Sequence, residues 1–139
     1  MFRFRCIALG MLALFVFSLT LHVSLAQAKP RSPQVIAAVF HADWCGKCKQ
    51  MGPSAMKTMA SYARDKNVKF VKFDLTDDST KAQSAKLAAR NGIAPVWNSN
   101  QKTGMVLLVD GKTRKVVDTI VSTDSQKDMK RKIEAAKRG

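Results

Sequence analysis

The residues of this chain best suited to chemistry are two cysteines, Cys45 and Cys48, which are separated by two residues. The remaining cysteine, Cys6, lies near the N-terminus. Thiols at this spacing can exchange disulfides, bind a soft metal ion or form a short structural bridge. A bridge that closes so short a loop removes little chain entropy, so it would add little stability. We therefore predict that the pair serves chemistry.

A strand and a helix are expected to position the two cysteines. Residues 34–40 form a continuous apolar run rich in β-branched side chains, which predicts a buried strand. A helix is predicted to begin at or beside Cys45 and to end near residue 66. Cys45 would then lie at the helix N-terminus, where free N–H groups and the helix dipole favour a thiolate, and Cys48 would be more protected. The Cys45 thiolate is expected to attack a substrate disulfide, and Cys48 to resolve the mixed disulfide.

The rest of the chain alternates between strand and helix patterns. Strands are predicted over residues 68–74, 105–109 and 116–121, with a turn at Asp110-Gly111 in the last pair. One helix is predicted over 77–97, followed by a polar loop at 98–103. Thr123, with Gln126 three residues later, is predicted to begin a final helix. The order β-α-β-α-β-β-α predicts an α/β fold, a mixed four-stranded sheet flanked by helices.

Residues 1–28 have the pattern of a secretory signal peptide. Arg3 and Arg5 precede an apolar run, and Ala26-Gln27-Ala28 is a cleavage signal, so we expect a mature domain of residues 29–139. The stretch 7–26 is also long enough for an uncleaved membrane anchor. In either case the two arginines stay inside and the rest of the chain crosses, which predicts a periplasmic location.

The exported part of the chain is strongly basic. Without Arg3 and Arg5, 22 basic residues outnumber 10 acidic ones, a net charge of +12. The lysines are spread along the whole chain without interleaved aromatic residues, so nucleic acid is not an expected partner. The charge is interpreted mainly as a solvated surface, with attraction to an anionic membrane surface or to acidic client proteins as the alternative.

The segment Trp44-Cys45-Gly46-Lys47-Cys48-Lys49 resembles the active-site signature of the thioredoxin-like superfamily, and Pro53 lies where that family has its helix-kinking proline. The resemblance covers essentially all of the mature chain, without the first strand and helix of the full-length family fold. It implies a thioredoxin-like thiol–disulfide oxidoreductase that needs no cofactor. It also implies that Cys45 attacks, that Cys48 resolves and that Trp44 shapes the surface that meets protein substrates.

Two positions depart from the family pattern. Val39 occupies the position where the family commonly has a buried acid that assists proton transfer at the second cysteine. Thr103-Gly104 stands where the family has a cis-proline facing the disulfide. A cis bond without proline is costly, so we expect this peptide to be trans. The resemblance therefore implies neither the family's mode of substrate docking along this loop nor its usual exclusion of metal from the dithiol.

Two functions from different classes follow. The first is a reductase of exported proteins, which could receive electrons from a membrane-bound redox partner; it is favoured over an oxidase because Gly46-Lys47 lacks the histidine that strongly oxidising relatives often carry. The second is a soft-metal protein that holds Cu(I) on the same two thiolates. Three methionines at helical spacing are consistent with the second function but are expected to be core residues: Met51, Met56 and Met59. His41 is expected at a strand end without a catalytic role.

Overall fold

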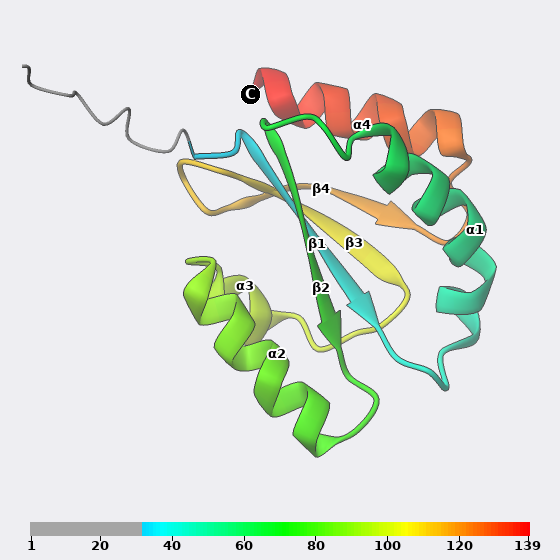
Figure 1. Ribbon diagram of the computed structural model, residues 1–139, viewed down its shortest axis with the longest axis vertical. Coiled ribbons are helices and arrows are strands. Elements are labelled where there is room, and N and C mark those ends of the chain that lie inside the picture. The colour runs from blue at the N-terminus through cyan, green and yellow to red at the C-terminus, as the bar shows by residue number, and fades with distance from the viewer. Residues whose placement is uncertain (1–31) are drawn as a thin grey trace, which may run out of the picture.

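In the computed structural model, which describes residues 32–139, the chain folds into a four-stranded mixed sheet with helices on both faces (Figure 1). The strand order is β2-β1-β3-β4. Strand β1 (Val35–His41) pairs in parallel with β2 (Val68–Asp74) and antiparallel with β3 (Met105–Asp110), which in turn pairs antiparallel with β4 (Val116–Val121). This architecture confirms the predicted fold class, and each strand lies within one residue of its predicted bounds.

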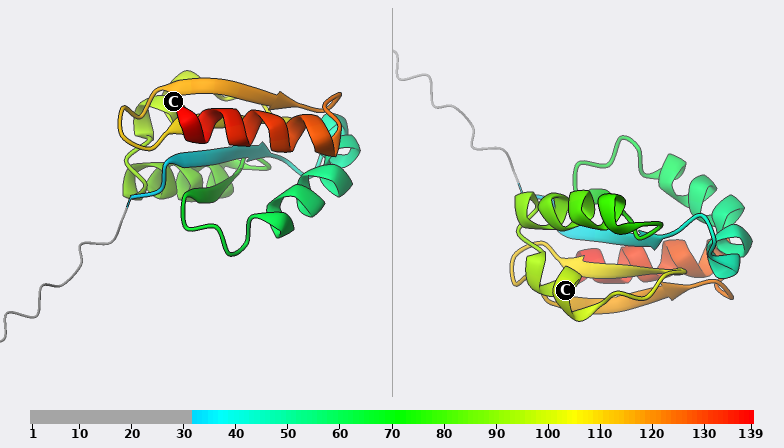
Figure 2. Two further views of the ribbon diagram at one scale, coloured as in Figure 1. Left: turned by 90° about the horizontal axis from the view of Figure 1, so that it is seen from above. Right: turned by 90° about the horizontal axis from the view of Figure 1, so that it is seen from below.

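The helices form two layers around the sheet. They are α1 (Gly46–Ser61), α2 (Asp78–Arg90), α3 (Ala94–Ser99) and α4 (Gln126–Arg138). Helices α2 and α3 lie on one face and α1 and α4 on the other (Figures 1 and 2). Strand β1 is buried on both faces: Ile36 and Phe40 belong to one core cluster, and Val35 and Ala37 belong to the other. Burial on both faces explains why its sequence is continuously apolar instead of alternating.

Aromatic rings fill the core between the sheet and helices α2 and α3. The rings of Phe40 and Phe73 lie 5.1 Å apart between centroids, and Trp97 lies 6.0 Å from Phe40 and 5.1 Å from Phe73. This cluster lies directly behind the end of β1 that leads to the cysteines.

The predicted helix over 77–97 is in fact two helices. The chain leaves α2 at Asn91 and turns at Gly92, whose φ of +67° is readily adopted only by glycine. Helix α3 then starts with Pro95 in its first turn, a position that needs no N–H donor. The apolar periodicity continues through this break, which is why the sequence pattern merged the two helices.

The ends of two other helices also differ from prediction. Helix α1 ends at Ser61, not near residue 66, because a turn closed by the Asp65 N–H on the Tyr62 carbonyl follows it. Helix α4 is capped by Ser125 and not by Thr123: the Ser125 hydroxyl accepts from the Asp128 N–H at 3.2 Å. Serine with a carboxylate three residues later is the same kind of capping pattern, displaced by two residues.

The predicted signal peptide, residues 1–28, lies outside the described residues. Over residues 32–139, no helix is both long and apolar enough to cross a membrane. Figure 1 shows that the described chain begins close to the C-terminal end of α4.

Candidate active site at the start of helix α1

Cys45 occupies the N-cap of α1, at the end of the short segment that follows β1. Its backbone is extended, with φ −81° and ψ 108°, and its Sγ accepts the Cys48 N–H at 3.1 Å. Its carbonyl oxygen accepts from Cys48 N and Lys49 N, at 3.1 and 3.2 Å, and so begins the helical ladder. The Cys48 N–H is thus shared between the sulfur and the carbonyl oxygen of Cys45. A sulfur that accepts an N–H at a helix N-terminus is stabilised as a thiolate when the pair is reduced.

Cys45 and Cys48 form a disulfide, with their Cα atoms 5.3 Å apart. The residues are 6 and 7 % exposed, so burial does not separate them as the sequence analysis expected. Their surroundings do differ. Cys48 Sγ lies 3.8 Å from the Phe40 carbonyl oxygen and borders a cavity of about 260 Å³ between α1, β1 and β2, whereas Cys45 faces the loop before β3.

Gly104, in that loop, lies against the disulfide. Its N–H donates to the Phe40 carbonyl oxygen at 3.0 Å, and its φ is +81°. A Cβ at this position would lie 3.5 Å from Cys45 Sγ and only 2.7 Å from Lys47 Cβ. The described residues contain no cis peptide bond, so the Thr103–Gly104 bond is trans as predicted. The backbone of Gly104 thus lies directly against the side chains of Lys47 and Cys45.

Trp44 stands at the surface beside the pair, with 65 % of its area exposed. Its Nε1 donates to the Thr76 carbonyl oxygen at 3.2 Å, and the N–H of the preceding Asp43 donates to Thr76 Oγ1 at 3.1 Å. The Thr76 hydroxyl in turn donates to Asp74 at the end of β2. Thr76 therefore joins the cysteine-bearing loop to the sheet.

Sequence reasoning missed Thr76. The only local signal is a threonine two residues after the carboxylate of Asp74, a common turn arrangement. In the structure the Thr76 hydroxyl and N–H, in that order, lower the pKa of Asp74, with smaller contributions from His41 and Lys72.

The remaining motif residues lie along α1. Gly46 is the first residue of the helix, and no atom lies within 4 Å of where its Cβ would be. Pro53 lies inside the helix, about two turns beyond Cys45. The structure records no side-chain hydrogen bond from either residue to the disulfide.

His41 and the methionines border the same cavity as Cys48. His41 Nε2 lies 3.1 Å from Asp43 Oδ1 at the rim. Met51 is buried, as predicted for a core residue, but Met56 is 71 % exposed, and both line the cavity together with Met59. Residues 32–139 contain no cluster of three or more His, Cys, Asp or Glu side chains arranged to hold a metal ion.

The fold and the cysteine motif were compared with those of known proteins. Residues 25–103, more than half of the chain, match the family model described as Thioredoxin. No curated protein sequence matches the chain.

Among solved structures, dsbF of MTB is 19 % identical with a TM-score of 0.51, over 76 % of this chain and 82 % of the other. The thioredoxin Mala s 13 of Malassezia sympodialis is 24 % identical with a TM-score of 0.50, over 78 % and 81 %. StoA from Bacillus subtilis is 16 % identical with a TM-score of 0.50, over 73 % and 84 %. At these identities the likeness concerns the fold. Together with the family match, it shows that the chain belongs to the thioredoxin family, as a thioredoxin-like thiol–disulfide oxidoreductase.

Proposed function

We propose that this protein is an exported reductase that acts on disulfides of periplasmic proteins through Cys45 and Cys48. The observation that carries the proposal is the position of Cys45 at the N-cap of α1, where its sulfur accepts the Cys48 N–H. The same helical turn places Cys48 close enough to form a disulfide with it. One sulfur can therefore be held as a thiolate while the other remains available to resolve a mixed disulfide.

The reaction balances within the dithiol and the client. The Cys45 thiolate attacks one sulfur of a client disulfide, the client S–S bond breaks, and the departing client thiolate takes up a proton. Cys48 then loses its proton and attacks Cys45 Sγ, which forms the Cys45–Cys48 disulfide and releases the second client sulfur. The dithiol gives two electrons to the client, so each cycle requires two electrons from a donor, for which we propose a membrane-bound redox partner.

Substrate would meet the surface formed by Trp44 and the loop at Thr103-Gly104. The exposed indole is held by its bond to Thr76, and the backbone at Gly104 lies against Cys45 without an intervening side chain. An extended client segment could therefore approach the disulfide at this loop even though the loop carries no proline.

The roles of the two cysteines are tested with Cys48→Ser and Cys45→Ser. Cys48→Ser is expected to accumulate a mixed disulfide with a model disulfide protein, because the resolving thiol is absent. Cys45→Ser, the matched control, should accumulate none. Non-reducing electrophoresis and mass spectrometry measure both. Trapping by Cys45→Ser alone would reverse the assignment.

The direction of exchange is measured by the reduction potential of the pair, equilibrated against defined thiol–disulfide buffers. A reductase is expected near about −270 mV, whereas a value near about −120 mV would identify an oxidant that donates its disulfide to clients. The proposal of a reductase depends on the Gly46-Lys47 dipeptide, and the second value would overturn it.

Export is tested separately by the mass of the protein recovered from the periplasm. Cleavage after Ala28 predicts a chain that starts at Lys29. Recovery of the uncleaved 139-residue chain in the membrane fraction would show an anchor instead.

A second candidate function is Cu(I) binding by the two thiolates. It is favoured by one observation, that the methionines Met51, Met56 and Met59 border the cavity next to Cys48 and could add a thioether ligand. Rapid turnover of a model disulfide supports the reductase. Stoichiometric retention of Cu(I) through a chelator challenge, without turnover, supports the metal protein.

A further inference from the structure

The end of the molecule opposite the disulfide carries a cluster of exposed basic side chains, here called the basic end. It consists of six exposed residues from four segments: Arg64, Lys66, Arg90, Lys112, Lys115 and Arg138. Strand β1 starts at this end and runs to the cysteines, so the length of the strand separates the basic end from the disulfide (Figure 1).

Recorded contacts hold these segments together. Lys137 Nζ lies 3.0 Å from Asp65 Oδ2, which joins the turn over residues 64–66 to the end of α4. Arg114, in the turn between β3 and β4, donates to the Asn91 carbonyl oxygen at 3.4 Å and so joins that turn to the end of α2. Val35 N donates to the Asn67 carbonyl oxygen at 3.0 Å. The basic residues therefore belong to one surface.

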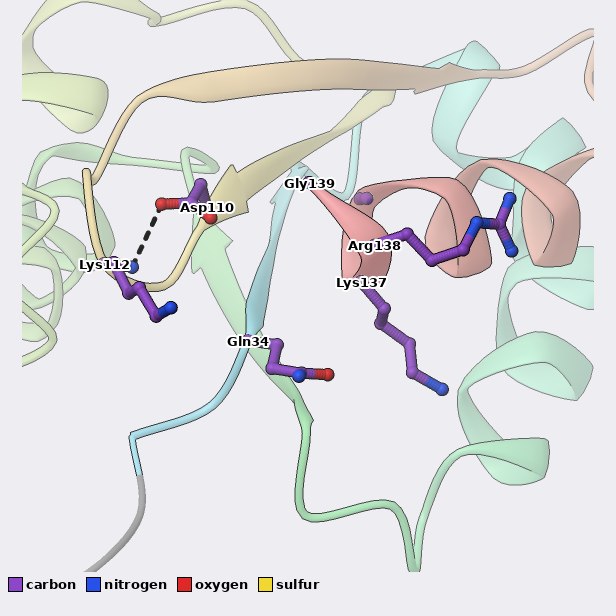
Figure 3. A pocket seen from close by; sticks show the side chains of 7 residues that line it. Gln34, Asp110, Lys112, Lys137, Arg138 and Gly139 are labelled. Atoms are coloured by element: carbon purple, nitrogen blue, oxygen red, sulfur yellow. Dashed lines mark hydrogen bonds between the residues drawn. The ribbon is translucent and has the colours of Figure 1, made fainter.

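A cavity of about 210 Å³ opens on this surface. Figure 3 shows Lys112 on one side of it, Lys137 and Arg138 on the other, and Gln34 between them. Lys137 is occupied by Asp65 and Glu134, whereas Lys112 and Arg138 have no recorded side-chain ion pair among residues 32–139.

The carboxylates nearest to this end do not neutralise its exposed charge. Asp65 is half-buried and bonded to Lys137, and Asp110 is half-buried and accepts from the N–H groups of Lys112 and Thr113. In the part of the chain that the structure describes, Asp43, Asp77 and Asp78 are exposed and lie toward the disulfide, whereas Glu134, whose side chain is 44 % exposed, is paired with Lys137 near the basic end. The carboxylates near the basic end are already paired or half-buried, so its exposed charge is predominantly positive.

The rest of the chain is attached at this same end. The described residues start at Ser32, and the Gln34 carbonyl oxygen accepts from Gly111 N at 2.7 Å, beside Lys112. The 31 residues that precede Ser32 include the apolar stretch 7–26, which belongs to a predicted signal peptide or, in the alternative, to an uncleaved membrane anchor. A domain still joined to a membrane-inserted N-terminal segment would have the basic end nearer to the bilayer than the disulfide.

We propose that the basic end is a docking surface for the anionic headgroups of a lipid bilayer, and that docking points the disulfide away from the membrane. Each basic side chain near an anionic leaflet contributes to binding, and the attraction decays within a Debye length of about 8 Å. Lysines toward the other end are then too distant to contribute equally, so the surface selects an orientation. The inference does not depend on the chemistry of the dithiol, so disulfide exchange and lipid binding succeed or fail independently.

The experiment compares partition of the exported protein, produced from the full sequence, onto two kinds of vesicle. One kind is phosphatidylcholine alone and the other contains phosphatidylglycerol as well; the measured quantity is the ratio of binding to the two. The test variant combines Lys66→Gln, Lys112→Gln and Arg138→Gln. The matched control removes three exposed lysines from elsewhere: Lys86→Gln, Lys102→Gln and Lys127→Gln.

The wild type is expected to prefer the anionic vesicles, and the preference should fall with added salt. The test variant should lose about tenfold or more of this preference, since each basic residue at an anionic surface contributes up to about a fivefold change. The control should keep most of it. Equal losses in both variants would overturn the proposal. A wild type without any preference for anionic vesicles would also overturn it, and would favour an acidic protein as the partner of the basic end.

Orientation has its own measurement. Of the two tryptophans, Trp97 is buried and Trp44 is exposed beside the disulfide. Brominated lipids in the bound vesicles should therefore leave Trp44 fluorescence unquenched. Quenching would place the disulfide end on the membrane and contradict the proposed orientation.

Discussion

At the scale of single residues, Gly104 is the position where backbone conformation and packing both require glycine. Its φ of +81° costs about 1–2 kcal/mol for other residues, and an added Cβ would lie 2.7 Å from Lys47 Cβ. Gly104→Ala is therefore expected to lower the free energy of unfolding of the oxidised protein by about 1–3 kcal/mol. Urea unfolding measures this change.

Gly52→Ala is the matched control. Gly52 lies inside α1, and beyond its chain neighbours and the adjacent helix backbone no atom lies within 4 Å of where its Cβ would be. Alanine favours a helix over glycine by up to about 1 kcal/mol, so this variant should be as stable as the wild type or more stable. Similar destabilisation by both substitutions would show that the contact of Gly104 with the disulfide loop does not contribute specifically to the free energy of unfolding.

Thr76 is the second residue whose importance is local and testable. Thr76→Val removes the acceptor of the Asp43 N–H and a donor to Asp74, which should cost about 1–2 kcal/mol at neutral pH. Thr76→Ser keeps the hydroxyl and should cost less. The comparison, again by urea unfolding, separates the hydrogen bonds from the size of the side chain.

The same pair of variants makes a prediction about acid stability. The pKa of Asp74 is lowered from 3.8 in the folded protein, so its stabilising contribution is present above that value and is lost as the pH falls through the folded pKa. Thr76→Val should therefore show a shallower loss of stability with acid than the wild type, because less of the pKa shift remains. An unchanged slope in Thr76→Val would assign the shift to other groups.

At the scale of elements, the packing of α1 against α4 is reported by Tyr62, the residue that follows α1. Its hydroxyl donates to Glu134 Oε1 at 2.8 Å. Burial, and next the hydrogen bond to Glu134, raise the pKa of Tyr62 from 10.0 to about 12. Tyr62 is the only tyrosine in the chain, so absorbance near the tyrosinate band follows this residue alone.

We expect the folded protein to ionise Tyr62 near pH 12 and the unfolded protein near pH 10. Because the folded pKa is the higher one, this contribution to stability is complete below pH 10 and is lost as the pH rises toward 12. Tyr62→Phe, the control, should lack that alkaline loss. Ionisation of the folded wild type near pH 10 would show that α1 and α4 do not bury the ring as described.

At the scale of the whole molecule, we expect the fold not to depend on the disulfide. Two core clusters on opposite faces of the sheet stabilise the domain, and the disulfide closes a loop of only a few residues at one end. Loop-closure entropy then gives the bond at most about 2 kcal/mol. The reduced protein should remain folded, with a free energy of unfolding lower by no more than that amount.

Urea unfolding with and without reductant measures the difference, and the double variant Cys45→Ala, Cys48→Ala controls for effects of the reductant itself. Loss of tertiary structure on reduction would contradict the prediction. It would mean that the bond braces the fold, which would weaken the case for a pair that cycles between two redox states.

Much of the fold was predictable because the relevant patterns are local. In β2, β-branched and aromatic residues dominate a short run that Lys69 and Lys72 interrupt, and the strand matches its predicted bounds. The division of the second helix at Gly92 and the capping of α4 by Ser125 were not predicted correctly. The apolar positions continue past Gly92 and Pro95, which mark the break between the helices, and Thr123 and Ser125 offer similar capping patterns two residues apart.

The sequence by itself determined the cysteine pair at a strand-to-helix junction, the family signature around it and the departures at Val39 and Gly104. These properties follow from residue identity and short spacing. Only the tertiary structure decided that Gly104 adopts a positive φ against Lys47 and that Thr76 holds the loop before Cys45. It also decided that basic residues from four segments share one end. Contacts between segments so far apart in the chain depend on strand order and helix packing, which no local pattern encodes.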